Sequence, residues 1–309
     1  MPPRLKRALN ASILIAGLAF CVFALKRLQQ DYPQHGSFSV GGVLLAAGCA
    51  IAALSATALA WQRYMRAFLG ERLPLVEAMY QICVMQIGKY VPVMIGGFLA
   101  RISANALNLS ARRIVIATTV EQIGAMGSAL VIGIDCYALA RMPVAAPIVI
   151  AASVSIVWVI PSLWAIAPRL YARLRDSFVS KSIAPASDPE PAMLRQALAF
   201  QFAQMLVMAV FIGTVILQVA PELSLRSSAL MSGAYLISIV AGIAVVFLPG
   251  GIGVREAVFV WLASGEVDTT EGLRLALAMR IAMSLLDLAA GALCVPLRVA
   301  SARGEVRRS

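Results

Sequence analysis

Apolar runs of about 20 residues recur along almost the whole chain, and they constrain the fold more than any other feature. A helix needs about 20 apolar residues to cross the hydrocarbon core of a bilayer, where every backbone N–H and C=O group must be satisfied within the segment. The chain is 61% hydrophobic and only 13% charged, whereas soluble domains carry about 25% charged residues. We therefore expect an all-α, polytopic bundle of membrane helices, with one integral membrane domain over residues 1–309.

Six runs are long enough for a full crossing, and two further apolar stretches are interrupted by Pro and Gly. The six are 9–28, 39–61, 114–139, 144–166, 193–219 and 273–297. The interrupted stretches, 75–104 and 228–264, are each too long for one crossing, while their parts are short for two. We expect each to be a re-entrant helix pair, since non-helical backbone is tolerated at membrane depth only where protein or a cavity surrounds it.

The positions of the basic residues support this topology. With the N-terminus in the cytoplasm, 17 of the 26 Lys and Arg residues fall in inner segments and five in outer segments. Cytoplasmic loops are enriched in these residues, so we expect both termini to be cytoplasmic, with an inner linker at about 168–192. The sequence thus predicts a multi-pass protein of the bacterial cytoplasmic membrane. Because the charges form no basic stripe, the net charge of +11 does not indicate a nucleic-acid partner.

The order of elements predicts an inverted repeat. Residues of about 9–140 give span, span, broken pair and span from the inside, and about 144–298 give the same order from the outside. Pro92 and Pro249, each followed by a pair of glycines, mark corresponding breaks. Many transporters are built in this way, with the substrate site at the broken segments near the bilayer midplane.

The first break carries positive charge on both sides, at Lys89 and Arg101. Pro92 prevents the helix from continuing, and the following glycines let the chain turn or let a ligand approach the backbone. The two cations either bind substrate or extend to the cytoplasmic interface. The candidate substrate-binding residues here are Lys89, Tyr90, Pro92, Gly96, Gly97 and Arg101.

The second break contains three glycines within five residues, which excludes an ordinary helix. Amides at the start of the next half-helix, with Arg255 close by, would suit a phosphate or a carboxylate. The alternative is that Arg255 and Glu256 pair with other side chains and only fasten the hairpin. The candidate substrate-binding residues here are Pro249, Gly250, Gly251, Gly253, Arg255 and Glu256.

Three further charges lie within otherwise ordinary spans: Glu121, Arg280 and Asp287. A charge at the centre of the bilayer costs about 2.5–3.5 kcal/mol on insertion scales, so a retained charge needs a partner or a function. Glu121 and Arg280 take comparable places in the two repeats with opposite signs, and Asp287 follows Arg280 by two helical turns on the same face. We hypothesise that they line a central cavity and either pair or contact a charged head group. A buried structural ion pair is the alternative.

Residues that common catalytic sites need are scarce. His35 is the only histidine, and it falls in a short outer loop. The sequence contains no H-E-x-x-H motif, no Cys–His metal cluster and no plausible Ser-His-Asp set. No two carboxylates have the spacing of a general acid–base pair. The sequence therefore predicts that the protein is not an enzyme and holds neither a cofactor nor a metal.

Both breaks resemble motifs of the lysylphosphatidylglycerol synthase transmembrane (flippase-like) family. The segment Gln86–Pro92, followed by Arg101, is similar to the first motif, and Phe247–Ala257 is similar to the second. Glu121, in the span after the first break, also fits the family pattern. A Gly commonly follows the Pro of the first motif, and here Val93 follows it. The resemblance covers residues of about 10–300.

This resemblance implies a lipid flippase fold that moves a phospholipid or a polyprenyl-linked lipid across the cytoplasmic membrane. In the best-known members the domain moves aminoacylated phosphatidylglycerol between leaflets, and a separate soluble domain makes that lipid. We expect a stand-alone member without the synthase domain, whose partner is a membrane lipid with an anionic or zwitterionic head group. The alternatives are an accessory membrane subunit that binds an enzyme of a lipid or glycan pathway, and an ion-coupled carrier of a small polar solute.

Overall fold

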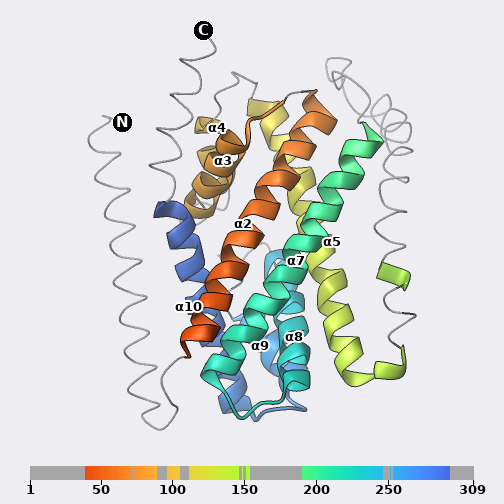
Figure 1. Ribbon diagram of the computed structural model, residues 1–309, viewed down its shortest axis with the longest axis vertical. Coiled ribbons are helices and arrows are strands. Elements are labelled where there is room, and N and C mark those ends of the chain that lie inside the picture. Colours follow the sequence, from red (N-terminus) through yellow and green to blue (C-terminus); the bar gives the residue numbers. More distant parts are fainter. Residues whose placement is uncertain are drawn as a thin grey trace.

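The computed structural model describes residues 39–70, 72–88, 96–104, 111–145, 148, 151–153, 190–245, 251 and 253–292. All regular structure in these ranges is helical, which confirms the predicted all-α class. Long helices run along the bundle in Figure 1, and shorter ones lie toward its two ends. The helices are α2 (Val40–Leu69), α3 (Leu75–Gly88), α4 (Gly96–Ser103), α5 (Ala111–Arg141), η1 (Pro143–Ala145), α7 (Pro191–Val219), α8 (Leu225–Ala244), α9 (Val254–Ala263) and α10 (Thr269–Ala292).

Five of the described helices are long and apolar enough to cross a membrane: α2, α5, α7, α8 and α10. Four of them match predicted spans, and together they have the character of a multi-pass membrane protein. The predicted span 9–28 and most of 144–166 lie outside the described residues. The fifth helix, α8, differs from the prediction. Both arms of the second broken stretch were expected to be too short to cross the membrane. α8 has 20 residues, which is long enough, so this expectation holds only for α9, which has 10 residues.

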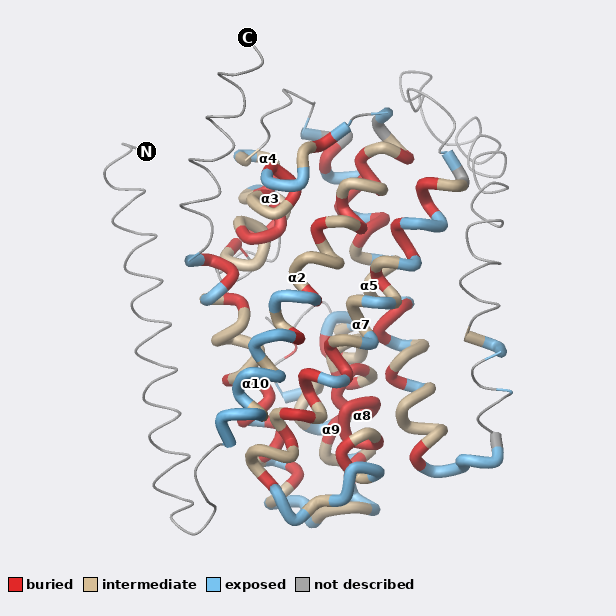
Figure 2. Tube along the Cα trace, viewed as in Figure 1, coloured by how far each residue is buried: buried red, intermediate tan, exposed pale blue. Residues whose placement is uncertain are grey.

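The outer faces of the long helices remain apolar. Large hydrophobic side chains such as Leu44, Ile51, Ile123 and Leu206 are exposed, while the buried residues face the interior of the bundle (Figure 2). Soluble proteins rarely expose so much contiguous apolar surface. Lipid tails solvate such a surface as well as protein does, so this pattern suits helices in a bilayer.

The two broken stretches form helix pairs at opposite ends of the bundle (Figure 1). α3 and α4 pack against each other near one end, and α8 and α9 pack against each other near the other. α3 ends at Gly88 and α8 ends at Ala244, each just before the motif that was predicted to break it. The sequence signal of Pro and Gly therefore located both breaks.

Gly251 and Gly253 turn the chain into α9. Their φ angles are 65° and 86°, in the left-handed region that favours glycine. A Cβ on Gly251 would lie 2.6 Å from the Cα of Gly242 in α8. This approach leaves no room for a side chain, so the glycines hold the start of α9 against the end of α8.

The two helix pairs interlock with the rest of the bundle. The helix that follows each pair packs against the first helix of the other pair, α5 against α8 and α10 against α3, while α2 packs against α7. The α5–α8 crossing is tight, because a Cβ on Gly233 would lie 2.4 Å from the carbonyl oxygen of Gly133. Small residues that let helix backbones approach closely are typical of membrane helix contacts.

The core consists of two clusters of buried side chains. One contains Trp61, Tyr64 and Ile82 and lies around α3, and the other contains Tyr235 and Phe259 and lies around α8 and α9. α2 and α7 contribute to both clusters, so these two helices connect the halves of the bundle. α3 therefore packs into one cluster, and α8 and α9 pack into the other.

Candidate functional site

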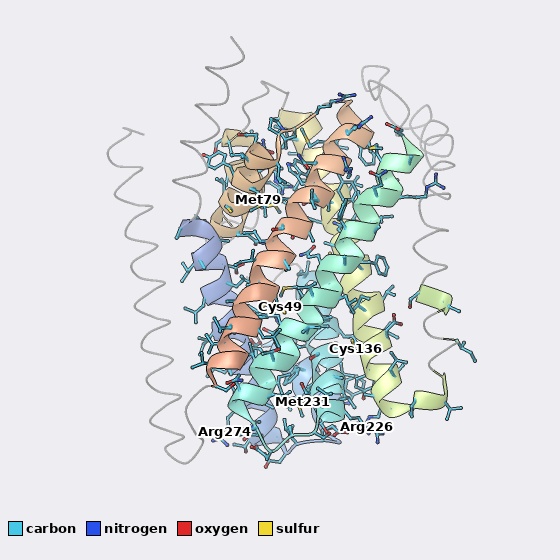
Figure 3. The ribbon with its side chains drawn as sticks, viewed as in Figure 1. Cys49, Met79, Cys136, Arg226, Met231 and Arg274 are labelled. Atoms are coloured by element: carbon cyan, nitrogen blue, oxygen red, sulfur yellow. The ribbon has the colours of Figure 1, made fainter. Side chains whose placement is uncertain are left out.

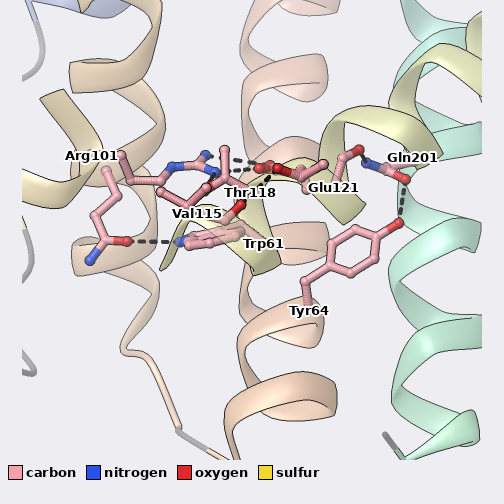
Figure 4. A network of polar contacts seen from close by, with 9 residues as sticks. Trp61, Tyr64, Arg101, Val115, Thr118, Glu121 and Gln201 are labelled. Atoms are coloured by element: carbon pink, nitrogen blue, oxygen red, sulfur yellow. Dashed lines mark hydrogen bonds and ion pairs between the residues drawn. The ribbon is translucent and has the colours of Figure 1, made fainter. Parts of the chain in front are cut away.

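Arg101 and Glu121 form an ion pair in the interior of the bundle (Figure 4). Arg101 lies in α4 and Glu121 in α5, and their side chains are 0% and 3% exposed. The guanidinium donates from Nη1 to Glu121 Oε2, and Nη2 lies 3.5 Å from Oε1. Nη1 also donates to Thr118 Oγ1 at 3.2 Å. The pair fastens the short helix α4 to the long helix α5.

Trp61 of α2 supports this pair from one side. Its ring lies under the guanidinium of Arg101, 3.9 Å from Cζ to the ring centroid. Such a contact stabilises a cation most where water is excluded. The indole N–H donates to Gln81 Oε1 at 2.8 Å, and Gln81 in turn donates to Glu77 Oε1 at 2.9 Å. The polar contacts thus continue from α4 through α2 into α3.

Gln201 of α7 extends the contacts in the other direction. Its Nε2 donates to the backbone carbonyl of Glu121 at 2.7 Å, and its Oε1 accepts from the Tyr64 hydroxyl at 2.6 Å. Figure 4 shows Gln201 between these two residues. A continuous chain of buried polar groups therefore joins α3, α2, α4, α5 and α7. We call Trp61, Arg101, Thr118, Glu121 and Gln201 the Arg101 cluster.

A second ion pair joins α9 to α10. Arg280 Nη1 donates to Glu256 Oε1, and the Glu256 Oε2 atom accepts from the Gly253 amide at 2.7 Å. Both carboxylate oxygens of Glu256 are therefore engaged, one in capping α9 and one in holding α10. The side chains of Glu256 and Arg280 are 19% and 31% exposed, so this pair is far more accessible than Arg101–Glu121.

Arg255 lies beside this second pair and uses less of its hydrogen-bonding capacity. Its Cζ stands 4.6 Å from the centroid of the Tyr235 ring in α8. Among the described residues, its buried Nε and Nη2 atoms have no hydrogen-bond partner, and the buried hydroxyl of Tyr235 makes no hydrogen bond of ordinary geometry. We call Tyr235, Arg255, Glu256 and Arg280 the Arg255 cluster.

The structure brings some of the predicted site residues together and separates others. One prediction was that Glu121 and Arg280 pair with each other. Instead, Glu121 pairs with Arg101 of the short helix α4, and Arg280 pairs with Glu256 of the short helix α9. Gly96 and Gly97 are buried at the start of α4, against Gly88 of α3. Asp287 is buried in α10, 6% exposed. Lys89, Tyr90, Pro92, Pro249 and Gly250 lie outside the described residues.

The alternative for Arg101, that it extends to the cytoplasmic interface, is wrong, because its side chain is fully buried. The alternative for Arg255 and Glu256 was that both pair with other side chains and only fasten the hairpin. Glu256 does pair, with Arg280 of α10, whereas Arg255 makes no ion pair with a described residue. Sequence reasoning missed Trp61, Tyr64, Thr118, Gln201 and Tyr235. Gln81 and Gln201, as amides within apolar runs, are a signal that could have found part of the Arg101 cluster.

Within the described part of the chain, no three His, Cys, Asp or Glu side chains come together as a metal site. Arg226 and Arg274, which the predicted topology places on the outer side, lie at the same end of the bundle, near the α8–α9 pair (Figure 3).

No family model, curated protein or solved structure matches this chain. The site is therefore interpreted from its own geometry.

Proposed function

We propose that this protein is a flippase-type transporter that moves a phospholipid or a polyprenyl-linked lipid across the cytoplasmic membrane. One observation carries the proposal. Two helix pairs at opposite ends of the bundle are each fastened to the following long helix by an Arg–Glu ion pair, and the sign of the pair is reversed between the ends. A lipid head group cannot cross hydrocarbon unless polar partners replace its water, and these clusters supply such partners.

The helix contacts support an inverted repeat. α2 corresponds to α7, the α3–α4 pair to α8–α9, and α5 to α10. Under this correspondence the α5–α8 contact becomes α10–α3, and the Arg101–Glu121 pair becomes Glu256–Arg280. An inverted repeat lets one half open while the other closes, which is the basis of alternating access in many transporters.

The different exposure of the two ion pairs suits one state of such a cycle. Arg101–Glu121 is excluded from solvent, while Glu256–Arg280 is partly accessible. In a cycle of this kind the α3–α4 side is closed and the α8–α9 side is open, and the opposite state exposes the Arg101 cluster. The apolar outer faces of the helices leave the lipid tails in contact with the bilayer throughout.

A double variant tests the proposal. Loss of one partner from a buried ion pair leaves an unpaired charge, whereas apolar residues of similar size in place of both are often tolerated. We therefore expect Arg101→Met/Glu121→Leu to fold but to lose most lipid exchange. The matched control is Arg274→Met/Glu271→Leu, which removes a more exposed ion pair with the same substitutions.

The measurement is exchange of a fluorescent phospholipid or polyprenyl phosphate between the leaflets of proteoliposomes, read as bleaching by an impermeant reductant beyond the outer-leaflet fraction. Exchange by the wild type and the control variant, with exchange at least about tenfold slower in the double variant, supports transport through the Arg101 cluster. Equal rates would make the pair structural only. Solute uptake without exchange of any lipid would favour the solute carrier, and neither activity would favour the accessory subunit.

A further inference from the structure

Arg255 differs from the other arginines of the two clusters in what its guanidinium touches. Arg101 and Arg280 donate to carboxylates, although Arg101 Nε is also buried without an acceptor. Arg255 pairs with no carboxylate of a described residue, and both its Nε and its Nη2 atoms are buried without an acceptor there. Its one described aromatic contact, at 4.6 Å from the Tyr235 ring, leaves the in-plane N–H groups free. A buried donor without an acceptor is unfavourable, so natural structures seldom keep one unless a ligand or water satisfies it.

The two N–H groups of Arg255 that have no acceptor, on Nε and Nη2, can bind one ligand together. In a guanidinium, the Nε–H and the outward N–H of Nη2 point in the same direction along one edge. This edge forms a fork that matches two oxygens of a phosphate or a carboxylate, and such bidentate contacts are among the strongest hydrogen bonds in proteins. The free edge of Arg255 is therefore a preformed receptor for an oxyanion.

Tyr235 supplies a second, independent sign of a ligand. Its side chain is 1% exposed, and its buried hydroxyl makes no hydrogen bond of ordinary geometry with a described residue, although it lies close enough to the Arg255 side chain to interact with it. Buried tyrosine hydroxyls usually find a partner. The hydroxyl and the two N–H groups of the Arg255 fork are thus buried close together, and none of them has an acceptor among the described residues.

The local charge also favours an anion. Arg255, Arg280 and Glu256 all lie close enough to Tyr235 to act on it electrostatically, which gives two positive charges and one negative charge. Glu256 is already engaged by Arg280 and by the amide of Gly253, so it is not available to Arg255. The start of α9 adds the positive end of a helix dipole.

We propose that Arg255 and Tyr235 form the binding site for the phosphate group of the transported lipid, an inference that rests on the function proposed above. The Arg255 fork holds two phosphate oxygens, and the Tyr235 hydroxyl donates to one of them. These two groups are buried, and they lie beside the Glu256–Arg280 pair, which is partly accessible. Glu256–Arg280 positions the start of α9 and thereby the fork, without contact to the phosphate.

Binding to the purified full-length protein tests the site. Native mass spectrometry from an uncharged detergent counts bound phosphatidylglycerol against diacylglycerol, which lacks the phosphate, and a parallel titration uses inorganic phosphate as the competitor. The variants are Arg255→Gln, which removes the charge, Arg255→Lys, which keeps the charge but breaks the fork, and Tyr235→Phe, which removes only the hydroxyl. Arg274→Gln, an equal loss of charge on α10, is the matched control.

We expect wild type and Arg274→Gln to bind phosphatidylglycerol equally. Arg255→Gln should weaken binding about tenfold or more, since a charge-assisted bidentate contact is lost. Arg255→Lys and Tyr235→Phe should each weaken it several-fold. Tyr235→Phe should fold normally, because the hydroxyl makes no hydrogen bond of ordinary geometry with a described residue.

Equal affinity of wild type and Arg255→Gln for phosphatidylglycerol would overturn the site. If inorganic phosphate bound at Arg255 while no phospholipid did, the assignment to a lipid would be wrong. Failure of the proposed function looks different. In that case the wild type binds phosphatidylglycerol through Arg255 but exchanges no lipid between leaflets, so the site stands and the transport proposal falls.

Discussion

At the scale of single residues, Arg101 shows how a charge is kept inside an apolar bundle. Its guanidinium contacts a carboxylate, a threonine hydroxyl and an indole face, which come from α5 and α2. Trp61 uses its own N–H on Gln81, so its ring face remains for the cation. A buried ion pair contributes little net stability by itself, but each partner depends on the other.

We predict that Glu121→Gln lowers the free energy of unfolding by about 3–5 kcal/mol, because Arg101 then remains buried without its counter-ion. The measurement is thermal unfolding of the purified protein in detergent. The control is Glu190→Gln, which removes a half-exposed carboxylate that makes a long contact of 3.9 Å with Arg66. This control should change stability by less than about 1 kcal/mol. Similar unfolding temperatures for the two variants would contradict the structural role of the pair.

At the scale of helices, the two broken pairs differ in length although they occupy comparable places. α3 and α4 have 14 and 8 residues, whereas α8 and α9 have 20 and 10. α8 extends through the tight α5–α8 crossing at Gly133 and Gly233, where backbones are in contact. The longer arm therefore has a firm attachment to the opposite half of the chain.

A substitution at this crossing tests its tightness. Gly233→Ala should destabilise the protein by about 1–3 kcal/mol, because its Cβ would meet the backbone of Gly133 and Tyr137 rather than a flexible side chain. Gly127→Ala in α5 is the control, since nothing lies within 4 Å of its Cβ position. It should be neutral, or stabilising by up to about 1 kcal/mol through helix propensity. Equal unfolding temperatures for both variants would mean that the crossing is looser than described.

The sequence predicted the elements better than it predicted their contacts. Pro and Gly act within a few residues of their position, so the ends of α3 and α8 could be read directly. The start of α8 at Leu225 could not be read from the sequence. Hydrophobicity identifies the apolar run, but it does not identify Ser224 as the residue that caps the helix. The partner of Glu121 depends on how α4 folds back on α5, and that packing leaves no local pattern in the sequence.

At the scale of the whole molecule, the halves are joined by contacts between helices far apart in sequence. α2 packs along α7, and Gln218 near the end of α7 bonds with both the backbone and the hydroxyl of Ser39 at the start of α2. α5 packs on α8, and α10 packs on α3. We therefore expect that neither half keeps its core when it is separated from the other.

Two separately expressed fragments test this dependence. Fragments 1–175 and 176–309, divided within the predicted cytoplasmic linker, should co-purify as a single species when they are expressed together. Each alone should be degraded or aggregate, because the α3 or α8 surface is then uncovered. The measurement is size-exclusion chromatography after affinity capture through one fragment. A monodisperse single fragment would contradict the interlocked arrangement.

The α10–α3 contact also has a consequence for biosynthesis. α3 is complete when the ribosome has reached Gly88, but α10, which covers it, ends only at Ala292. At about 5–20 residues per second, roughly 10–40 s of translation separate the two events. During that interval the surface of α3 that α10 later covers must be covered by something else. For the first part of the interval Arg101 also lacks its ion-pair partner, because Glu121 has not yet been synthesised. The membrane insertion machinery is the natural candidate to shelter this α3 surface until the last helix arrives.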